Sequence, residues 1–154
     1  MQKRRINSRA IIWRDGTILA VRHKDSAGTE DDHWALPGGG LDYDEFIKDA
    51  VRREVFEELG VEAEVGKLIG MQQFYSRRED FSEELELFFH VYDSPAFDAI
   101  DLSKTSHGAN EIAEVKFVDP KQVYIKPDCL AEIDLAGIIA GTSLPHIENQ
   151  LAVV

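Results

Sequence analysis

Residues 39–61 read GGLDYDEFIKDAVRREVFEELGV, and this stretch decides what the chain can fold into and bind. Its spacing is Gly-x5-Glu-x7-Arg-Glu-Val-x-Glu-Glu-x-Gly-Val, with polar and glycine positions at Gly39, Glu45, Arg53, Glu54, Glu57, Glu58 and Gly60. At average residue usage such a pattern arises by chance on the order of once in a billion starting positions. It places three carboxylates on one helix directly after a glycine-rich turn. That arrangement is typical of sites for hard divalent cations and, through them, for phosphate oxygens.

The pattern predicts a helix over 45–59, with Asp42 or Asp44 as its N-cap and Gly60 as a left-handed C-cap. At 3.6 residues per turn, the three glutamates share an arc of roughly 100°. This arc borders an apolar stripe that must face the core, formed by Ile47, Val51, Val55 and Leu59. A solvated charged face is the common alternative for such spacing. Like charges three and four residues apart repel, however, so this cluster favours a cation that neutralises it.

Three consecutive glycines, 38–40, follow Pro37 and end a short expected strand at 34–36. Glycine lets the backbone come close to a ligand because it has no Cβ atom. Taken alone, such a run is most often only a turn. One turn ahead of an acidic helix, it becomes part of the same expected site.

The composition bounds the class of protein. The chain has 154 residues, a formal net charge of −12 and a pI of about 4.8, which argues against binding to duplex nucleic acid or an anionic membrane. We expect one domain over 1–154. The single cysteine, Cys129, indicates a reducing compartment and is interpreted as a buried structural thiol. No apolar segment follows the basic start at 1–5, so we expect a cytoplasmic protein.

The remaining pattern predicts a mixed sheet with helices on its two faces, an α+β or α/β/α sandwich. Strands are expected at 6–13, 17–23, 34–36, 61–75, 84–93 and 112–118, with Asp15-Gly16 as a two-residue hairpin turn between the first two. Loops are expected at 24–33 and 94–110. A second helix is expected from Pro127 to about Ala140.

The residues of the first stretch, with WALPGGG at 34–40 before it, resemble the signature of the Nudix hydrolase superfamily, which includes MutT-like proteins. The resemblance implies an α+β fold of the Nudix type, an α/β/α sandwich with a mixed sheet. It also implies hydrolysis of a nucleoside diphosphate linked to another moiety, with Mg2+ or Mn2+ required. One position departs from the family, because Asp44 stands where a glycine is common, and this could shift the helix start or add an acidic group.

The resemblance also assigns roles to single residues. Glu54, Glu57 and Glu58 resemble the metal-binding carboxylates, and the carbonyl of Gly38 resembles a further ligand. Arg53 and Glu45 resemble the pair that orients them, and Glu57 or Glu54 is the candidate general base. A further acidic ligand before a late strand is assigned to Glu111, with Glu114 as the alternative.

Substrate contacts are expected outside this stretch. The candidate cations are Arg9, Arg22, Lys24, Arg77 and Arg78, and the candidate stacking residues are Tyr75, Phe74 and Tyr43. The expected partner is a small nucleotide, namely a nucleoside triphosphate (oxidised purines included), a nucleotide sugar or a dinucleoside polyphosphate; a homodimer is compatible with the pattern. Two other classes of protein share this fold: a non-catalytic nucleotide-binding or regulatory module, and an isomerase of isoprenoid diphosphates. The intact acidic stretch argues against the first, and the position of Cys129, far along the chain, argues against the second.

Overall fold

A computed structural model describes residues 1–151 of the protein. Its strands are β1 (Arg4–Arg14), β2 (Thr17–His23), β3 (Trp34–Ala35), β4 (Gly38–Gly40), β5 (Val65–Tyr75), β6 (Glu83–Val91), β7 (Ile112–Val118), β8 (Ile125–Lys126) and β9 (His146–Asn149). Its α-helices are α1 (Ile47–Leu59), α2 (Gly108–Glu111) and α3 (Leu135–Ala140), and its 3-10 helices are η1 (Pro95–Asp98), η2 (Leu102–Lys104) and η3 (Asp128–Ala131). No helix of the described part is long and apolar enough to cross a membrane.

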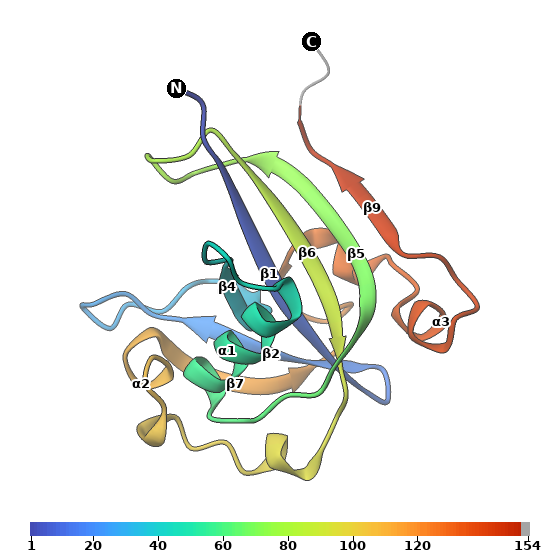
Figure 1. Ribbon diagram of the computed structural model, residues 1–154. Coiled ribbons are helices and arrows are strands. Elements are labelled where there is room, and N and C mark those ends of the chain that lie inside the picture. The colour runs from blue at the N-terminus through green and yellow to red at the C-terminus, as the bar shows by residue number, and fades with distance from the viewer. Residues whose placement is uncertain (152–154) are drawn as a thin grey trace.

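The strands form one mixed, curled sheet, as the sequence predicts. Its order is β8-β3-β2-β1-β6-β5-β9, with β4 paired to β1 and β7 paired to β2. β1 and β6 are parallel from Arg4 to Ile12, while β5 and β6 are antiparallel. Figure 1 shows β1, β6 and β5 running side by side through the molecule, with α1 beside β4 and α3 near β5.

Two hydrophobic cores lie on opposite faces of β1. Ile12 belongs to the core that buries Val51 and Val55 of α1, whereas the neighbouring Ile11 belongs to the core that buries Ile138 of α3. Adjacent residues of a strand point to opposite faces, so α1 and α3 cover different sides of the sheet. This arrangement agrees with the predicted helices on two faces.

The predicted hairpin is present. Asp15 and Gly16 have φ angles of 46° and 86°, and Arg14 pairs with Thr17. Positive φ at both central residues is the signature of the two-residue turn that matches the twist of the flanking strands.

The start of α1 differs from the prediction. The helix begins at Ile47, its N-cap is Phe46, and no side chain caps it, so neither Asp42 nor Asp44 is the N-cap. Asp44 instead adopts a left-handed conformation with φ of 61°. Asp tolerates this region better than most residues do, which explains how it replaces a glycine here. The C-terminal end is as predicted, with Gly60 at φ 71°.

Other segments also differ. The glycine run, predicted as a turn, forms strand β4 against Asn7–Arg9 of β1. The predicted helix from Pro127 is interrupted: η3 ends at Ala131, and α3 starts after Asp134, whose carboxylate accepts a hydrogen bond from the Gly137 amide at 3.0 Å. The expected loop 94–110 contains η1, η2 and the start of α2, and β9 was not predicted. Cys129 is buried in η3, as expected for a structural thiol.

A buried histidine of β6 makes the stability depend on pH. His90 is 8% exposed and its ring lies 4.8 Å from that of Tyr92. Burial, with a contribution from Lys67, lowers the pKa of His90 below its ordinary value of 6.5. The folded protein therefore binds a proton less readily here than the unfolded chain does.

We expect the free energy of unfolding to fall as the pH drops below about 6.5, by up to about 1.4 kcal/mol per pH unit from this residue. His90→Phe keeps an aromatic ring at the position and removes the titration. Urea unfolding at pH 7.5, 6.5 and 5.5 should therefore show that the free energy of unfolding falls less with pH in the variant than in the unaltered protein. The same dependence of the free energy of unfolding on pH in both proteins would contradict the role of His90. His23 is present in both proteins, so its contribution cancels in the comparison.

Candidate active site

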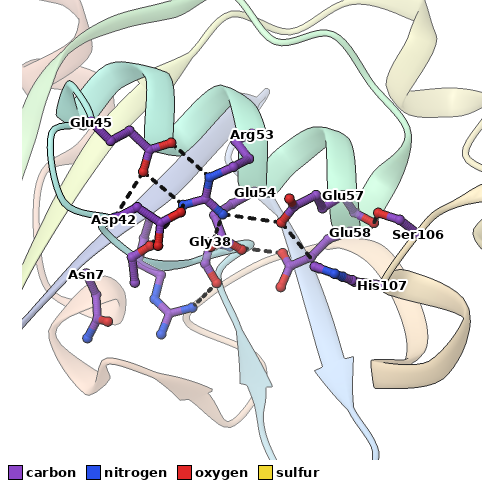
Figure 2. A network of polar contacts seen from close by, with 12 residues as sticks. Asn7, Gly38, Asp42, Glu45, Arg53, Glu54, Glu57, Glu58, Ser106 and His107 are labelled. Atoms are coloured by element: carbon purple, nitrogen blue, oxygen red, sulfur yellow. Dashed lines mark hydrogen bonds and ion pairs between the residues drawn. The ribbon is translucent and has the colours of Figure 1, made fainter.

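One guanidinium organises the acidic helix. Arg53 binds both carboxylate oxygens of Glu45, with Nε–Oε1 and Nη2–Oε2 distances of 2.8 and 3.0 Å. It also donates to the Gly40 carbonyl at 3.0 Å, to Glu54 Oε1 at 2.9 Å and to Glu57 Oε2 at 3.3 Å. Figure 2 shows Arg53 in the middle of these groups. The contacts with Glu45, and then those with Glu54, raise the pKa of Arg53, so the arginine stays charged.

Glycine is required where β4 meets the helix. A Cβ atom on Gly39 would lie 2.5 Å from Oε1 of Glu54, and one on Gly38 would lie 2.2 Å from the Ser8 carbonyl oxygen. Gly38 also has a φ of 140°, which L side chains rarely adopt. Gly39 therefore lets Glu54 approach the backbone, and Gly38 lets β4 approach β1.

Glu58 is held at the base of the site. Its side chain accepts a hydrogen bond from the Gly38 amide at 2.9 Å, and the residue is 3% exposed. Burial raises the pKa of Glu58 to about 8, and burial also raises the pKa of Glu54. Both carboxylates are therefore costly to ionise without a cation beside them.

Glu57 has a partner that the sequence pattern does not reveal. His107, just before α2, places Nδ1 3.2 Å from Oε2 of Glu57 (Figure 2). Its backbone amide also donates to the Glu57 carbonyl at 3.0 Å. The two residues are far apart in sequence, so only the packing of α2 against α1 brings them together.

The Gly38 carbonyl is already engaged on one side. Arg9 Nη1 donates to this oxygen at 2.6 Å, and Arg9 Nε donates to Glu86 Oε1 at 2.6 Å. A carbonyl oxygen has two lone pairs, so one remains for a metal ion. Arg9 thus lies behind the glycine strand and joins it to β6.

These groups border one cleft of about 800 Å3. It is lined by Glu54, Glu57, Glu58 and Glu111, by the cations Arg5, Arg9, Arg53, Arg77, Arg78 and Lys126, by His23, His33 and His107, and by Gln72, Phe74 and Glu86 among others. Several guanidinium groups therefore face a cleft in a protein of strongly negative net charge. The lining also includes Asp31 and Asp128, so its carboxylates offset its cations. Phosphate groups are favoured beside the guanidinium groups and wherever a bound metal ion neutralises the carboxylates.

The predicted substrate-contacting residues divide into two groups. Arg9 and Arg77 line the cleft, as do Arg78 and Phe74. Arg22 instead stacks on Trp34, with its guanidinium carbon 4.6 Å from the ring centre, and lies near Glu30 and Glu114. Tyr75, Tyr43 and Lys24 are absent from the lining residues. Arg5, which does line the cleft, is a residue that the sequence analysis missed.

Of the two acidic residues considered as a further ligand, Glu111 lines the cleft and Glu114 does not. Carboxylate oxygens are the ligands that Mg2+ prefers in proteins, so the donor set of the cleft fits a hard divalent cation. Within residues 1–151, no three His, Cys, Asp or Glu side chains converge as a formed metal centre. Glu54 and Glu57 form ion pairs with Arg53 instead.

Comparison with known proteins defines the class. Residues 3–136 match the NUDIX domain, and the chain therefore belongs to the NUDIX family. The α+β fold is the one that the sequence predicts. Members of the family generally use divalent metal ions and act on small nucleotide substrates.

Two curated relatives are similar over part of their length. The MutT-like protein of Streptomyces ambofaciens is 42% identical over 67 residues, which are 44% of this chain and 40% of that protein. The nucleoside triphosphatase NudI of Escherichia fergusonii is 46% identical over 50 residues, which are 32% of this chain and 36% of that protein. Each match thus spans less than half the length of the relative.

Solved structures extend the similarity to most of the chain. The solution structure of the E. coli ORF135 protein has a TM-score of 0.66 and 25% identity, over 90% of this chain and 94% of that chain. A MutT NUDIX hydrolase from Burkholderia pseudomallei has a TM-score of 0.62 and 22% identity, over 78% of this chain and 86% of that chain.

The central role of Arg53 can be tested without substrate. Lysine keeps the charge but cannot bind Glu45 with two parallel hydrogen bonds while also reaching Gly40. We expect Arg53→Lys to lower the free energy of unfolding by about 1–3 kcal/mol, as measured by urea unfolding in EDTA.

The neighbouring arginine is a matched control. Arg52 is more exposed than Arg53 and, within residues 1–151, forms an ion pair only with Asp49, one turn away. Arg52→Lys should therefore change stability by less than about 0.5 kcal/mol. Equal losses for the two variants would show that Arg53 is an ordinary surface cation.

Proposed function

We propose that this protein is a metal-dependent pyrophosphohydrolase. Its substrate is a nucleoside diphosphate linked to another moiety, and its catalytic centre is the acidic helix at the edge of the cleft. One observation carries the proposal: Glu54 and Glu57 contact Arg53, and Glu58 contacts the glycine strand, beside arginines that line the same cleft. Acidic side chains for metal and basic side chains for phosphate are thus combined in one place.

Glu54, Glu57, Glu58 and the second lone pair of the Gly38 carbonyl would hold Mg2+, with Mn2+ as a substitute and Glu111 as a further ligand. Bound divalent cations would neutralise phosphate oxygens and lower the pKa of a water molecule. The raised pKa values of Glu54 and Glu58 support this assignment, because a cation relieves the burial of their charge.

Individual side chains have further roles in the proposed hydrolysis. Glu57 or Glu54 takes the proton of the attacking water, for which a carboxylate must lie within hydrogen-bond reach. Arg53 and Glu45 keep the helix and the glycine strand in register, so the carboxylates stay aimed at the cleft. Arg9 and Arg77, which line the cleft, would bind phosphate oxygens of the substrate.

A nucleoside triphosphate is the substrate class that we test first. Similarity to a protein named nucleoside triphosphatase supports it, although the match covers only 32% of this chain. Nucleotide sugars and dinucleoside polyphosphates carry the same diphosphate bond and belong in the same assay.

Glu57→Gln tests the catalytic centre. The amide cannot take a proton from water and binds a divalent cation poorly, so we expect kcat to fall by about 100-fold or more. Phosphate and pyrophosphate release should be measured for all three substrate classes with Mg2+, with Mn2+ and with EDTA, and thermal unfolding should report an intact fold.

Glu64→Gln is the control, because Glu64 is exposed and lies between α1 and β5, outside the cleft lining. It should keep the activity of the unaltered protein. Full activity of Glu57→Gln with Mg2+ would show that the acidic helix is not the catalytic centre. Tight nucleotide binding with no turnover under any condition would favour the non-catalytic binding module instead.

A further inference from the structure

A row of buried polar side chains crosses the sheet at the cleft. Asn7 of β1, Glu86 of β6 and Gln72 of β5 lie opposite one another in register, so they project from the same face. They are 1%, 5% and 5% exposed. Polar side chains so deeply buried require hydrogen-bond partners, and any atom without one points to a ligand or a water molecule.

Gln72 has such an atom. Its Nε2 donates to Glu86 Oε2 at 2.6 Å, whereas its Oε1 is buried and has no partner among residues 1–151. The orientation of the amide is set by Glu86, because only the NH2 group can donate to a carboxylate. The oxygen therefore cannot exchange places with the nitrogen, and the unsatisfied acceptor destabilises the folded protein until a donor reaches it.

The surroundings of Gln72 suit a flat, aromatic ligand. Gln72 lines the cleft together with Phe74, which lies two residues further along β5 and on the same face of the strand. An aromatic side chain beside hydrogen-bonding groups is a common arrangement for a nucleobase, which stacks on the ring and presents its edge to the polar groups.

A continuous chain of hydrogen bonds joins this place to the acidic helix. Gln72 binds Glu86 at 2.6 Å, Glu86 binds Arg9 at 2.6 Å and Arg9 binds the Gly38 carbonyl at 2.6 Å. The Gly38 amide then binds Glu58 at 2.9 Å. A base at Gln72 and a diphosphate at the acidic helix would therefore occupy neighbouring parts of one cleft.

We propose that Gln72 selects nucleotides whose base carries an exocyclic amino group beside an accepting ring nitrogen on its pairing edge, with Oε1 of Gln72 accepting a hydrogen bond from that amino group. This inference rests on the proposed function and adds the substrate class. Cytosine and adenine present an amino group beside a ring nitrogen that accepts, which matches the Oε1 and the second N–H of the Gln72 amide. Uracil and hypoxanthine present an oxo group beside an N–H, and Glu86 prevents the amide from turning to match them.

The test compares matched nucleotides. We expect kcat/KM with Mg2+ to favour CTP over UTP and ATP over ITP, by about tenfold or more, because the oxo group would face an acceptor that it cannot satisfy. Gln72→Met has a similar shape and no polar group. It should reduce the preference to within about threefold, mainly by raising KM for CTP and ATP while kcat changes little.

Gln73→Met is the matched control. Gln73 is the next residue of β5, so it points to the other face, and its Nε2 donates to Glu83 at 3.0 Å. It is absent from the cleft lining. This variant should keep the preference for amino-bearing bases, and thermal unfolding of both variants should report that they are folded.

The outcomes separate the inference from the proposed function. Hydrolysis with no preference in the unaltered protein, or a preference that survives in Gln72→Met, overturns the role of Gln72 while the hydrolase proposal stands. No hydrolysis of any nucleotide with Mg2+ or Mn2+ overturns the hydrolase proposal. In that case calorimetric titration with CTP and UTP decides the inference by itself: tighter binding of CTP that Gln72→Met abolishes supports it, and equal affinities overturn it.

Discussion

The site depends on the contact between the Arg53 guanidinium and the groups around it. One cation holds Glu45 with two hydrogen bonds and reaches the carbonyl of Gly40. Helix α1 is thereby tied to the loop before it and to β4, which is itself paired to the long strand β1. Because the same guanidinium also reaches Glu54 and Glu57, it offsets the repulsion within the acidic cluster.

Burial changes the chemical properties of the polar groups at the site. Glu58 is buried and accepts a hydrogen bond from the Gly38 amide, and burial raises its pKa to about 8. Glu86 is also buried at the cleft, where it accepts hydrogen bonds from Arg9 and Gln72. In both places polar groups are kept away from water and held in one orientation, which makes them sensitive to the charge and hydrogen-bonding pattern of a ligand.

Local patterns predicted local structure well. The hairpin at Asp15-Gly16, the body of α1 and its cap at Gly60 follow from backbone preferences of a few residues, and all are confirmed. The predictions were wrong where tertiary contacts outweigh propensity. The glycine run pairs with β1 as a strand, and the expected C-terminal helix is divided because Asp134 caps the start of the shorter α3.

By itself the sequence determined the acidic helix, because the spacing of its glutamates and Arg53 is set by the 3.6-residue turn. It also predicted a close approach to the backbone at the glycine run, whereas the structure shows that Glu54 lies beside Gly39. Only the tertiary structure decided that His107 reaches Glu57, that Arg22 stacks on Trp34, and that Arg9 and Gln72 share Glu86. These partners come from separate elements, as with Arg9 and Glu86, which are 77 residues apart. Their meeting depends on strand order and register, which no short stretch of sequence encodes.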